Sequence, residues 1–163
     1  MKIKNIAAIF VAAGLAGCAA VPMTPTEFRQ AVRQDGEYME TYTVSRPFGE
    51  VARTMKKMGD ECLNFTLASS RNGGAGRPWA WGRSTFNASP KHAELLFQIK
   101  VEHRIDPTPE HGEYYLAADF TPVGAGRTKV DVFYWDRAVD AAKALKGWAT
   151  GDMLGCADAT QMF

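Results

Sequence analysis

The fold is decided by residues 94–103, which read Glu-Leu-Leu-Phe-Gln-Ile-Lys-Val-Glu-His. Every second residue of this stretch is apolar, at the positions Leu95, Phe97, Ile99 and Val101. Side chains of a strand point alternately to its two faces, so this pattern predicts a strand with one dry face and one mostly wet face. The strand must therefore belong to a sheet that is covered on one side.

Further strands are expected on both sides of this stretch. Aromatic and β-branched residues between turn residues predict them at residues 38–44, 65–68, 79–87, 113–121 and 128–135. In the strand 113–121 the alternation places four apolar residues on one face, namely Tyr114, Leu116, Ala118 and Phe120. Gly- and Pro-containing breaks separate the later strands, which favours antiparallel neighbours joined by turns.

Two amphipathic helices flank the run of strands. Ser45-Arg46-Pro47 supplies a capping hydroxyl and a proline for the first helix. Its apolar stripe is Phe48, Val51, Ala52, Met55, Cys62 and Leu63. Asp136 is expected to cap the second helix, whose stripe is Val139, Ala142, Leu145, Ala149, Met153 and Cys156. Three glycines at 147, 151 and 155 either break this helix or let it approach another backbone closely.

These elements predict an α+β domain of the order β-α-β(4-5)-α. Each helix has one apolar stripe and most strands have one apolar face, so the economical packing puts both helices on one face of a curved antiparallel sheet. This element order resembles the helix-grip domains, including those of the lipoprotein subunit of the outer-membrane β-barrel assembly machinery. The resemblance covers the mature chain as element order and implies a fold, not a function.

The first residues have the organisation of an export signal. Lys2 and Lys4 are followed by an apolar run from Ile6 to Leu15, which is shorter than the roughly twenty residues that span a bilayer. The segment then ends in Leu15-Ala16-Gly17-Cys18, which resembles the lipobox of bacterial lipoproteins. That resemblance implies cleavage before Cys18 and lipidation of its thiol. A plain secretory signal with a chance cysteine is the alternative.

The resemblance also implies a location. Several acyl chains make a firm membrane anchor, and Ala19 after the cysteine, rather than Asp, favours sorting to the outer membrane in this family. We expect residues 1–17 to be the signal peptide, 18–35 the lipidated cysteine, a tether and a short helix capped by Thr24 or Thr26, and 36–163 a single domain facing the periplasm.

Charge and cysteine usage limit the function classes. Removal of residues 1–17 takes away two of the 19 basic residues and none of the 18 acidic ones, which leaves a formal charge of −1 and favours no nucleic-acid partner. With Cys18 lipidated, Cys62 and Cys156 remain, and in an oxidising compartment they are most simply a disulfide. It would close a loop of about 95 residues and tie the two helices together, contributing up to roughly 4–5 kcal/mol on the chain-entropy model. Two buried free thiols or a reactive cysteine are the alternatives.

Two groups of residues are candidate sites. Trp79 and Trp81, two apart on one strand and flanked by Arg77 and Arg83, would form a binding face for a sugar, a peptide or a partner if they are exposed, and part of the core if they are buried. A turn holds His103, Asp106, Glu110 and His111, which are side chains that can bind a divalent metal, although their spacing fits an ordinary exposed loop as well.

The sequence has no nucleophile motif and no phosphate-binding loop, so we expect no catalytic residues and no cofactor. The leading hypothesis is a non-enzymatic binding or assembly module, anchored to the membrane by its N-terminal lipid and engaging an envelope protein. A carrier of an apolar ligand or lipid is the second, with Trp79, Phe97 and Tyr114 lining its cavity. An envelope enzyme with its site at the His103–His111 loop is the third.

Overall fold

The computed structural model describes residues 21–35, 38–69, 76–102, 107–152 and 155–163. It is an α+β domain built on one six-stranded antiparallel sheet with the strand order β1-β6-β5-β4-β3-β2. The strands are β1 (Met39–Val44), β2 (Phe65–Ala68), β3 (Pro78–Ser89), β4 (His92–Val101), β5 (Glu113–Pro122) and β6 (Thr128–Tyr134). The helices are α1 (Pro25–Asp35), α2 (Phe48–Cys62) and α3 (Val139–Thr150), with short 3-10 turns at Asp136–Ala138 and Ala159–Met162. The predicted fold class is confirmed.

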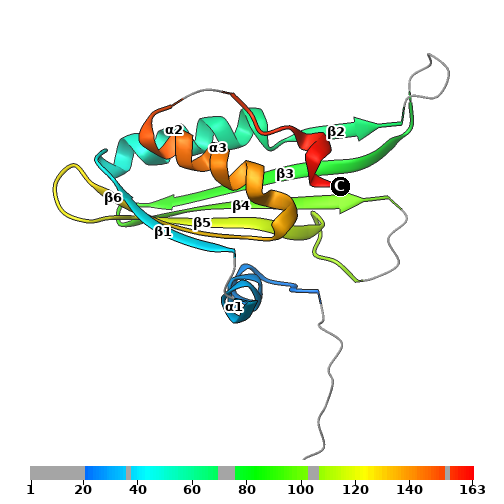
Figure 1. The fold of residues 1–163 in the computed structure, drawn as a ribbon, viewed down its shortest axis with the longest axis horizontal. Helices are drawn as coiled ribbons and strands as arrows, with labels where there is room; N and C mark the ends of the chain where they lie inside the picture. The colour runs from blue at the N-terminus through cyan, green and yellow to red at the C-terminus, as the bar shows by residue number, and fades with distance from the viewer. Residues whose placement is uncertain (1–20, 36–37, 70–75, 103–106, 153–154) are drawn as a thin grey trace, which may run out of the picture.

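Helices α2 and α3 pack side by side on one face of the sheet (Figure 1). Their buried residues meet the apolar alternation of β4, where Leu95, Phe97 and Ile99 all point into this layer. The largest side chain of the layer is Trp148 of α3, which is 1% exposed. The pattern of residues 94–103 therefore gives the expected result, a main core between two helices and the sheet.

Helix α1 lies on the opposite face of the sheet (Figure 1). Phe28 and Val32 are fully buried there, in a second core with Leu96 and Phe133. Residues 25–35, expected as part of a tether with a short helix, thus form a helix that packs against the domain.

The start of α1 is fixed by a reciprocal capping box. The backbone N–H of Glu27 donates to Thr24 Oγ1 (3.2 Å), and the backbone N–H of Thr24 donates to the Glu27 carboxylate (3.2 Å). Pro25 follows in the first turn, where a missing N–H costs nothing. Of the two expected capping residues, it is therefore Thr24 that caps the helix.

A bulge in β5 changes which face Tyr114 occupies. The register jumps between Phe97 paired with Leu116 and Gln98 paired with Tyr114, so Tyr115 is an extra residue in β5. Because an inserted residue reverses the alternation beyond it, Tyr114 lies in the α1 core, while Leu116 lies in the main core. The prediction that Tyr114 shares a face with Leu116 is wrong.

The predicted caps of the two main helices are also wrong. Helix α2 begins at Phe48 with Pro47 as its N-cap, and no side chain, including that of Ser45, caps it. Asp136 begins a 3-10 turn instead, and its carboxylate accepts from the backbone N–H of Arg137 (2.7 Å). Helix α3 then starts at Val139.

Helix α3 stops at Thr150 because Gly151 adopts a left-handed conformation with a φ of 99°. Two backbone N–H groups, of Gly151 and Asp152, donate to the carbonyl of Gly147 and complete the C-terminal cap. Of the two predictions made for the glycines at 147, 151 and 155, the one that they break the helix is correct. Cys156 therefore lies beyond α3 and not on its apolar face, and Met153 is outside the described residues.

None of the helices in the described part of the chain has the length and hydropathy of a membrane-spanning segment.

Candidate functional site

The predicted binding face lies on β3 in mixed surroundings. Arg77 is 72% exposed and forms an ion pair with Glu102 (2.6 Å). Trp79 is half-buried, and its ring meets the ring of Phe163, the last residue, with centroids 4.7 Å apart. Trp81 is half-buried and Arg83 is exposed. The binding face of Arg77, Trp79, Trp81 and Arg83 stays a prediction, because the tryptophans are neither core residues nor free surface.

The predicted metal site is only partly described. His103 and Asp106 are outside the described residues, whereas Glu110 and His111 are exposed. Among the residues that are described, no group of three His, Cys, Asp or Glu side chains is placed to hold a metal ion.

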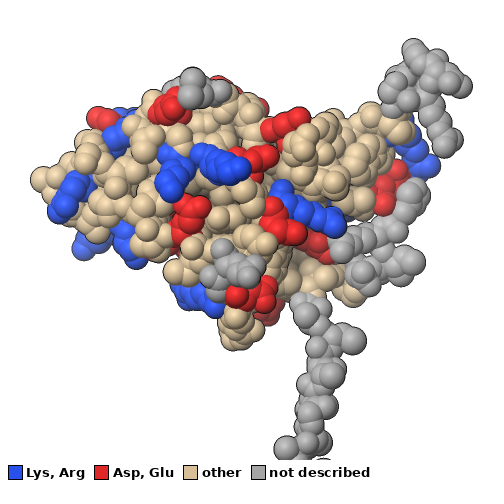
Figure 2. All heavy atoms as spheres, viewed as in Figure 1, with Lys and Arg blue, Asp and Glu red and all other residues tan. Residues whose placement is uncertain are grey.

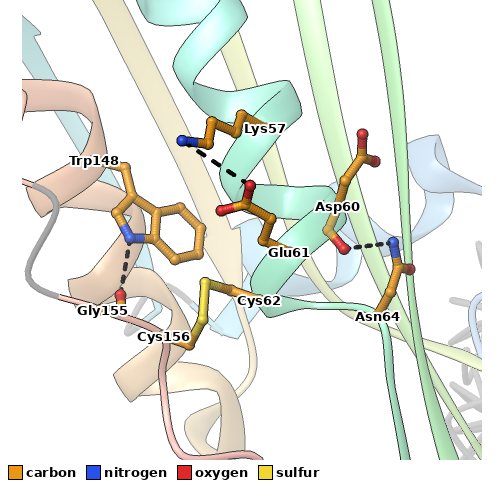
Figure 3. Close-up of a disulfide and its surroundings, with 8 residues drawn as sticks. All are labelled: Lys57, Asp60, Glu61, Cys62, Asn64, Trp148, Gly155 and Cys156. Carbon is orange, nitrogen blue, oxygen red and sulfur yellow. Dashed lines mark hydrogen bonds and ion pairs between the residues drawn. A yellow bond between two sulfur atoms is a disulfide. The ribbon is translucent and has the colours of Figure 1, made fainter.

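Cys62 and Cys156 form a disulfide, with their Cα atoms 5.0 Å apart (Figure 3). The bond joins the end of α2 to the segment after α3, so it does not tie two helices as expected. The ring of Trp148 faces the bond, and its indole N–H donates to the carbonyl of Gly155 (3.1 Å). The disulfide holds the C-terminal segment to the end of α2, and this hydrogen bond holds it to α3.

The residues expected to line a cavity for an apolar ligand do not converge. Phe97 lies in the main core, Tyr114 in the core under α1, and Trp79 against the C-terminal residue. The layer between the sheet and the helices is filled by side chains that are nearly all inaccessible to solvent. A ligand placed there would have to displace Trp148 and Phe97.

A surface pocket of about 310 Å³ lies beside the C-terminal half of α1. We call it the α1 pocket, and its lining is Val21, Pro22, Ala31, Gln34, Asp35, Glu113, Tyr114 and Trp135. Helix α1 supplies one wall, the start of β5 another, and the residue after β6 a third. The chain ahead of α1 forms the remaining wall.

The α1 pocket combines aromatic rings with carboxylates. Its charged groups, as far as the described lining extends, are Asp35 and Glu113, with no Lys, Arg or His among them. On the face shown in Figure 2, by contrast, charges of both signs are interspersed. Burial, followed by the nearby charge of Glu94, raises the pKa of Tyr114, so its phenol is neutral at physiological pH. The described lining of the pocket therefore includes two carboxylate side chains and two aromatic side chains.

A second hollow of about 210 Å³ adjoins the α1 pocket. The two share Glu113 and Trp135 as a common wall. The second hollow adds Tyr115, Asp136 and Arg137, so a guanidinium lies on the far side of the shared wall.

Helix α1 is held in place by an ion cluster as well as by its apolar residues. Arg29 donates through Nε to Asp119 Oδ2 (2.8 Å), through Nη2 to Asp119 Oδ1 (3.0 Å), and also through Nη2 to Glu94. Burial works against the charged guanidinium, but these hydrogen bonds outweigh it and hold the pKa of Arg29 above its ordinary value. His92 lies 3.0 Å from the same Asp119.

Aromatic contacts position the pocket wall. The ring of Phe28 meets that of Trp135 edge-on, with centroids 5.4 Å apart, and lies 5.9 Å from that of Tyr114. Because both pocket rings contact a fully buried residue of α1, the wall of the pocket is set by the packing of this helix. Sequence reasoning did not assign Glu113 and Trp135 to a site, since nothing local indicates that α1 lies beside them.

Comparison with known proteins adds only a loose likeness of shape. Among solved structures the chain is similar to CalU16 from Micromonospora echinospora, with a TM-score of 0.34 and 12% identity, covering 76% of this chain and 78% of that one. No family model matches the chain, and no curated protein is similar to it in sequence. What the protein does must therefore follow from its own residues.

Proposed function

We propose that this chain is a lipid-anchored envelope module that binds its ligand in the α1 pocket, at the surface of its membrane. The observation that carries the proposal is the position of Val21 and Pro22 in the wall of the pocket. Cys18, the residue of the lipobox-like sequence that would receive the lipid, is three residues before Val21. Since a chain extends by at most about 3.5 Å per residue, the Cα atom of Val21 in the pocket wall would lie within about 11 Å of the Cα atom of the anchored Cys18.

The compartment is supported by the two other cysteines. A disulfide between Cys62 and Cys156 persists in an oxidising environment such as the bacterial periplasm. In this proposal residues 1–17 are removed, Cys18 is acylated in the outer membrane, and the domain faces the periplasm. An envelope protein at the same membrane is its expected partner.

The form of the interior favours surface binding over carriage of an apolar ligand. Leu95, Phe97 and Trp148 fill the layer that a helix-grip carrier would leave open. The α1 pocket, in contrast, lies at the surface and is partly polar. The proposal is non-enzymatic because the described lining of this pocket offers no pairing of a nucleophile with a base.

The anchor is tested by the intact mass of the protein purified from its membrane. The expected mass is that of residues 18–163 plus a diacylglycerol and an amide-linked acyl chain. Globomycin should leave the signal attached, and Cys18→Ser should abolish the lipid. An unmodified Cys18 in the mature protein would refute the anchor.

The binding face is tested by a photo-crosslinking residue introduced in living cells. Gln34 is exposed and lines the α1 pocket, whereas Asp60 is exposed on α2, across the sheet from it. A crosslinker at position 34 should capture an envelope component that the same crosslinker at position 60 does not. Equal capture at both positions would refute the α1 pocket as the binding site.

A further inference from the structure

We propose that β1 is a docking edge for a second copy of this chain, which adds its own β1 in antiparallel orientation and joins the two sheets into one. This inference goes beyond the binding site proposed above, because it concerns the edge of the sheet and does not depend on the α1 pocket.

β1 is the outermost strand at one end of the sheet, and half of its backbone groups point away from the sheet (Figure 1). The N–H of Tyr134 donates to the carbonyl of Tyr38, and the pairing of β1 with β6 continues in the same register to Val44. Because opposed residues of an antiparallel ladder are alternately bonded and non-bonded, every second residue directs its N–H and C=O outward. Within the described part of the chain these outward groups have no hydrogen-bond partner, and they belong to Met39, Thr41 and Thr43.

β1 lacks the features that protect the edges of natural sheets. Such edges are commonly short, or they carry a bulge, a proline or a lysine. The six residues Met39–Val44 pair with β6 without a register shift and include neither proline nor lysine. At the other end of the sheet, β2 has four residues and a register shift between Leu67 and Ala68. The edge that is open to pairing is therefore β1.

A second copy of β1 matches this edge in the register centred on Thr41. In that register Thr41 lies opposite Thr41 of the second copy, and Met39 lies opposite its Thr43. Each outward residue then meets another outward residue, and each such pair exchanges two backbone hydrogen bonds. The side chains fit as well, because facing threonines are a favourable cross-strand pair and Met39, which is 43% exposed, covers the methyl group of Thr43.

The charges on the other face of β1 fit the same register. Lys146 of α3 donates to Glu40 (3.0 Å), and its Nζ lies 5.1 Å from the ring centroid of Tyr42. In the register centred on Thr41, Glu40 of the second copy lies opposite Tyr42 and therefore comes beside Lys146. Each copy thus offers a lysine to the carboxylate of the other, and the two Glu40 side chains do not face each other. This complementarity favours a second copy over an unrelated strand.

The symmetry of the pair places both copies the same way up. Two antiparallel edges are related by a two-fold axis perpendicular to the sheet, so α2 and α3 of both copies share one face and both α1 helices share the other (Figure 1). With the anchor proposed above, on which this one argument rests, both chains reach the membrane from the same side. Confinement to one membrane then raises the effective concentration of each copy for the other.

The test measures the oligomeric state of the full-length protein by analytical ultracentrifugation, in nonionic detergent with micelles in excess. We expect a monomer–dimer equilibrium. Thr41→Pro removes an outward N–H and leaves the ladder with β6 intact, since proline is tolerated where the N–H of an edge strand faces solvent. This variant should raise the Kd of the dimer at least about tenfold, because it removes the two central hydrogen bonds.

Thr66→Pro is the matched control on the opposite edge. The N–H of Glu102 donates to the carbonyl of Trp79, so Trp81 also bonds to β4 and Thr66, which lies opposite Trp81, directs its N–H outward from β2. This control should leave the Kd unchanged. Thr41→Lys, which places two like charges opposite each other, should weaken the dimer even if the proline variant fails to fold, and circular dichroism reports folding. A monomer at all concentrations up to about 1 mM, or an unchanged Kd in folded Thr41→Lys, would overturn the inference.

Cysteine crosslinking tests the register in the Cys18→Ser background. There the two other cysteines are joined in the native disulfide, so an introduced thiol is free to react. Thr41→Cys should form an intermolecular disulfide, because opposed Cα atoms of a bonded pair lie about 5.5 Å apart, which suits such a bond. Met39→Cys should crosslink to Thr43→Cys when the two variants are mixed, and neither should crosslink alone.

Thr66→Cys, an exposed position on β2, is the control for random collision and should give no crosslink. Crosslinking of Thr41→Cys no greater than that of Thr66→Cys would overturn the inference. Because this background has no thiol to lipidate, the result is independent of the proposed anchor, whose own test is the intact mass.

Discussion

Reduction of the disulfide between Cys62 and Cys156 should remove a large part of the stability of the domain. The two cysteines are 94 residues apart in the sequence. On the chain-entropy model, closing a loop of this length lowers the entropy of the unfolded chain by about 16 cal/mol/K, or about 4.7 kcal/mol at 25 °C. Net stabilities of domains are about 5–15 kcal/mol, so this loss is enough to bring a domain close to unfolding.

The loss is measured by urea unfolding of the full-length protein with and without reductant, followed by circular dichroism. Comparing oxidised and reduced protein of one sequence keeps the packing of the two side chains and changes only the covalent bond. With an unfolding entropy of about 2.1 cal/mol/K per residue for residues 25–163, the same loss corresponds to a fall in Tm of about 16 °C.

A decrease of less than about 1.5 kcal/mol would refute this reasoning. It would mean that the reduced chain keeps the two ends of the loop together when unfolded, or that the folded protein pays strain to form the bond. The double variant Cys62→Ala/Cys156→Ala, which has no thiol to react, should reproduce the reduced protein to within the small packing cost of losing the Cys62 sulfur, which is nearly buried.

Three other changes follow from the packing and the charges. Arg29→Met leaves two carboxylates without their guanidinium and should cost about 2 kcal/mol, seen as faster hydrogen exchange in α1, whereas Gln30→Met at an exposed position of the same helix should not accelerate it. Glu40→Gln should cost at most about 0.5 kcal/mol at pH 7. The hydrogen bond from Lys146, its partner on α3, lowers the pKa of Glu40 below its ordinary value of 4.5. The difference in unfolding free energy between the native chain and the variant is therefore full above pH 4.5 and disappears as the pH falls through the lowered pKa. Urea unfolding between about pH 3 and 7 measures this difference. Gly112→Ala should cost about 3 kcal/mol or more in thermal unfolding, because φ is 96° and a Cβ would lie 2.1 Å from a backbone oxygen of β4; Gly126→Ala, with φ at 74° and open space, should cost about 1 kcal/mol.

The main core was predictable because its alternation is local. Leu95, Phe97 and Ile99 occupy the face that the sequence pattern assigns to them. The prediction of the C-terminal helix was less accurate, because Gly151 ends the helix early and the buried Trp148 lies beside the predicted apolar stripe. An apolar stripe is broad enough to hide one more large residue.

The second core, between α1 and the sheet, could be predicted only in part from the sequence. Leu96 and Phe133 are apolar residues on the otherwise wet faces of their strands, and they mark the area that α1 covers. The spacing of Thr24 and Glu27 is that of a capping box, which locates the start of α1. Neither signal predicts which face of the sheet α1 packs against, because that depends on contacts between residues far apart in the sequence.

The α1 pocket was not predictable from local patterns. Tyr114 reaches it only because Tyr115 is an extra residue in β5, and no spacing in the sequence announces that bulge. Trp135 and Glu113 join it because β5 and β6 are neighbours, and Asp35 joins it because α1 crosses below them. A site assembled from three distant segments depends on the fold.

The pairing of β1 with β6 has a consequence for the order in which this protein forms. Thr41 of β1 lies opposite Asp131 of β6, its partner 90 residues later in the chain. The first strand therefore has no neighbour until nearly all of the polypeptide has been delivered, and such distant contacts form slowly. For a chain that we propose is exported, this delay is useful, because a polypeptide threaded through a translocation channel must remain unfolded until its last strand has crossed.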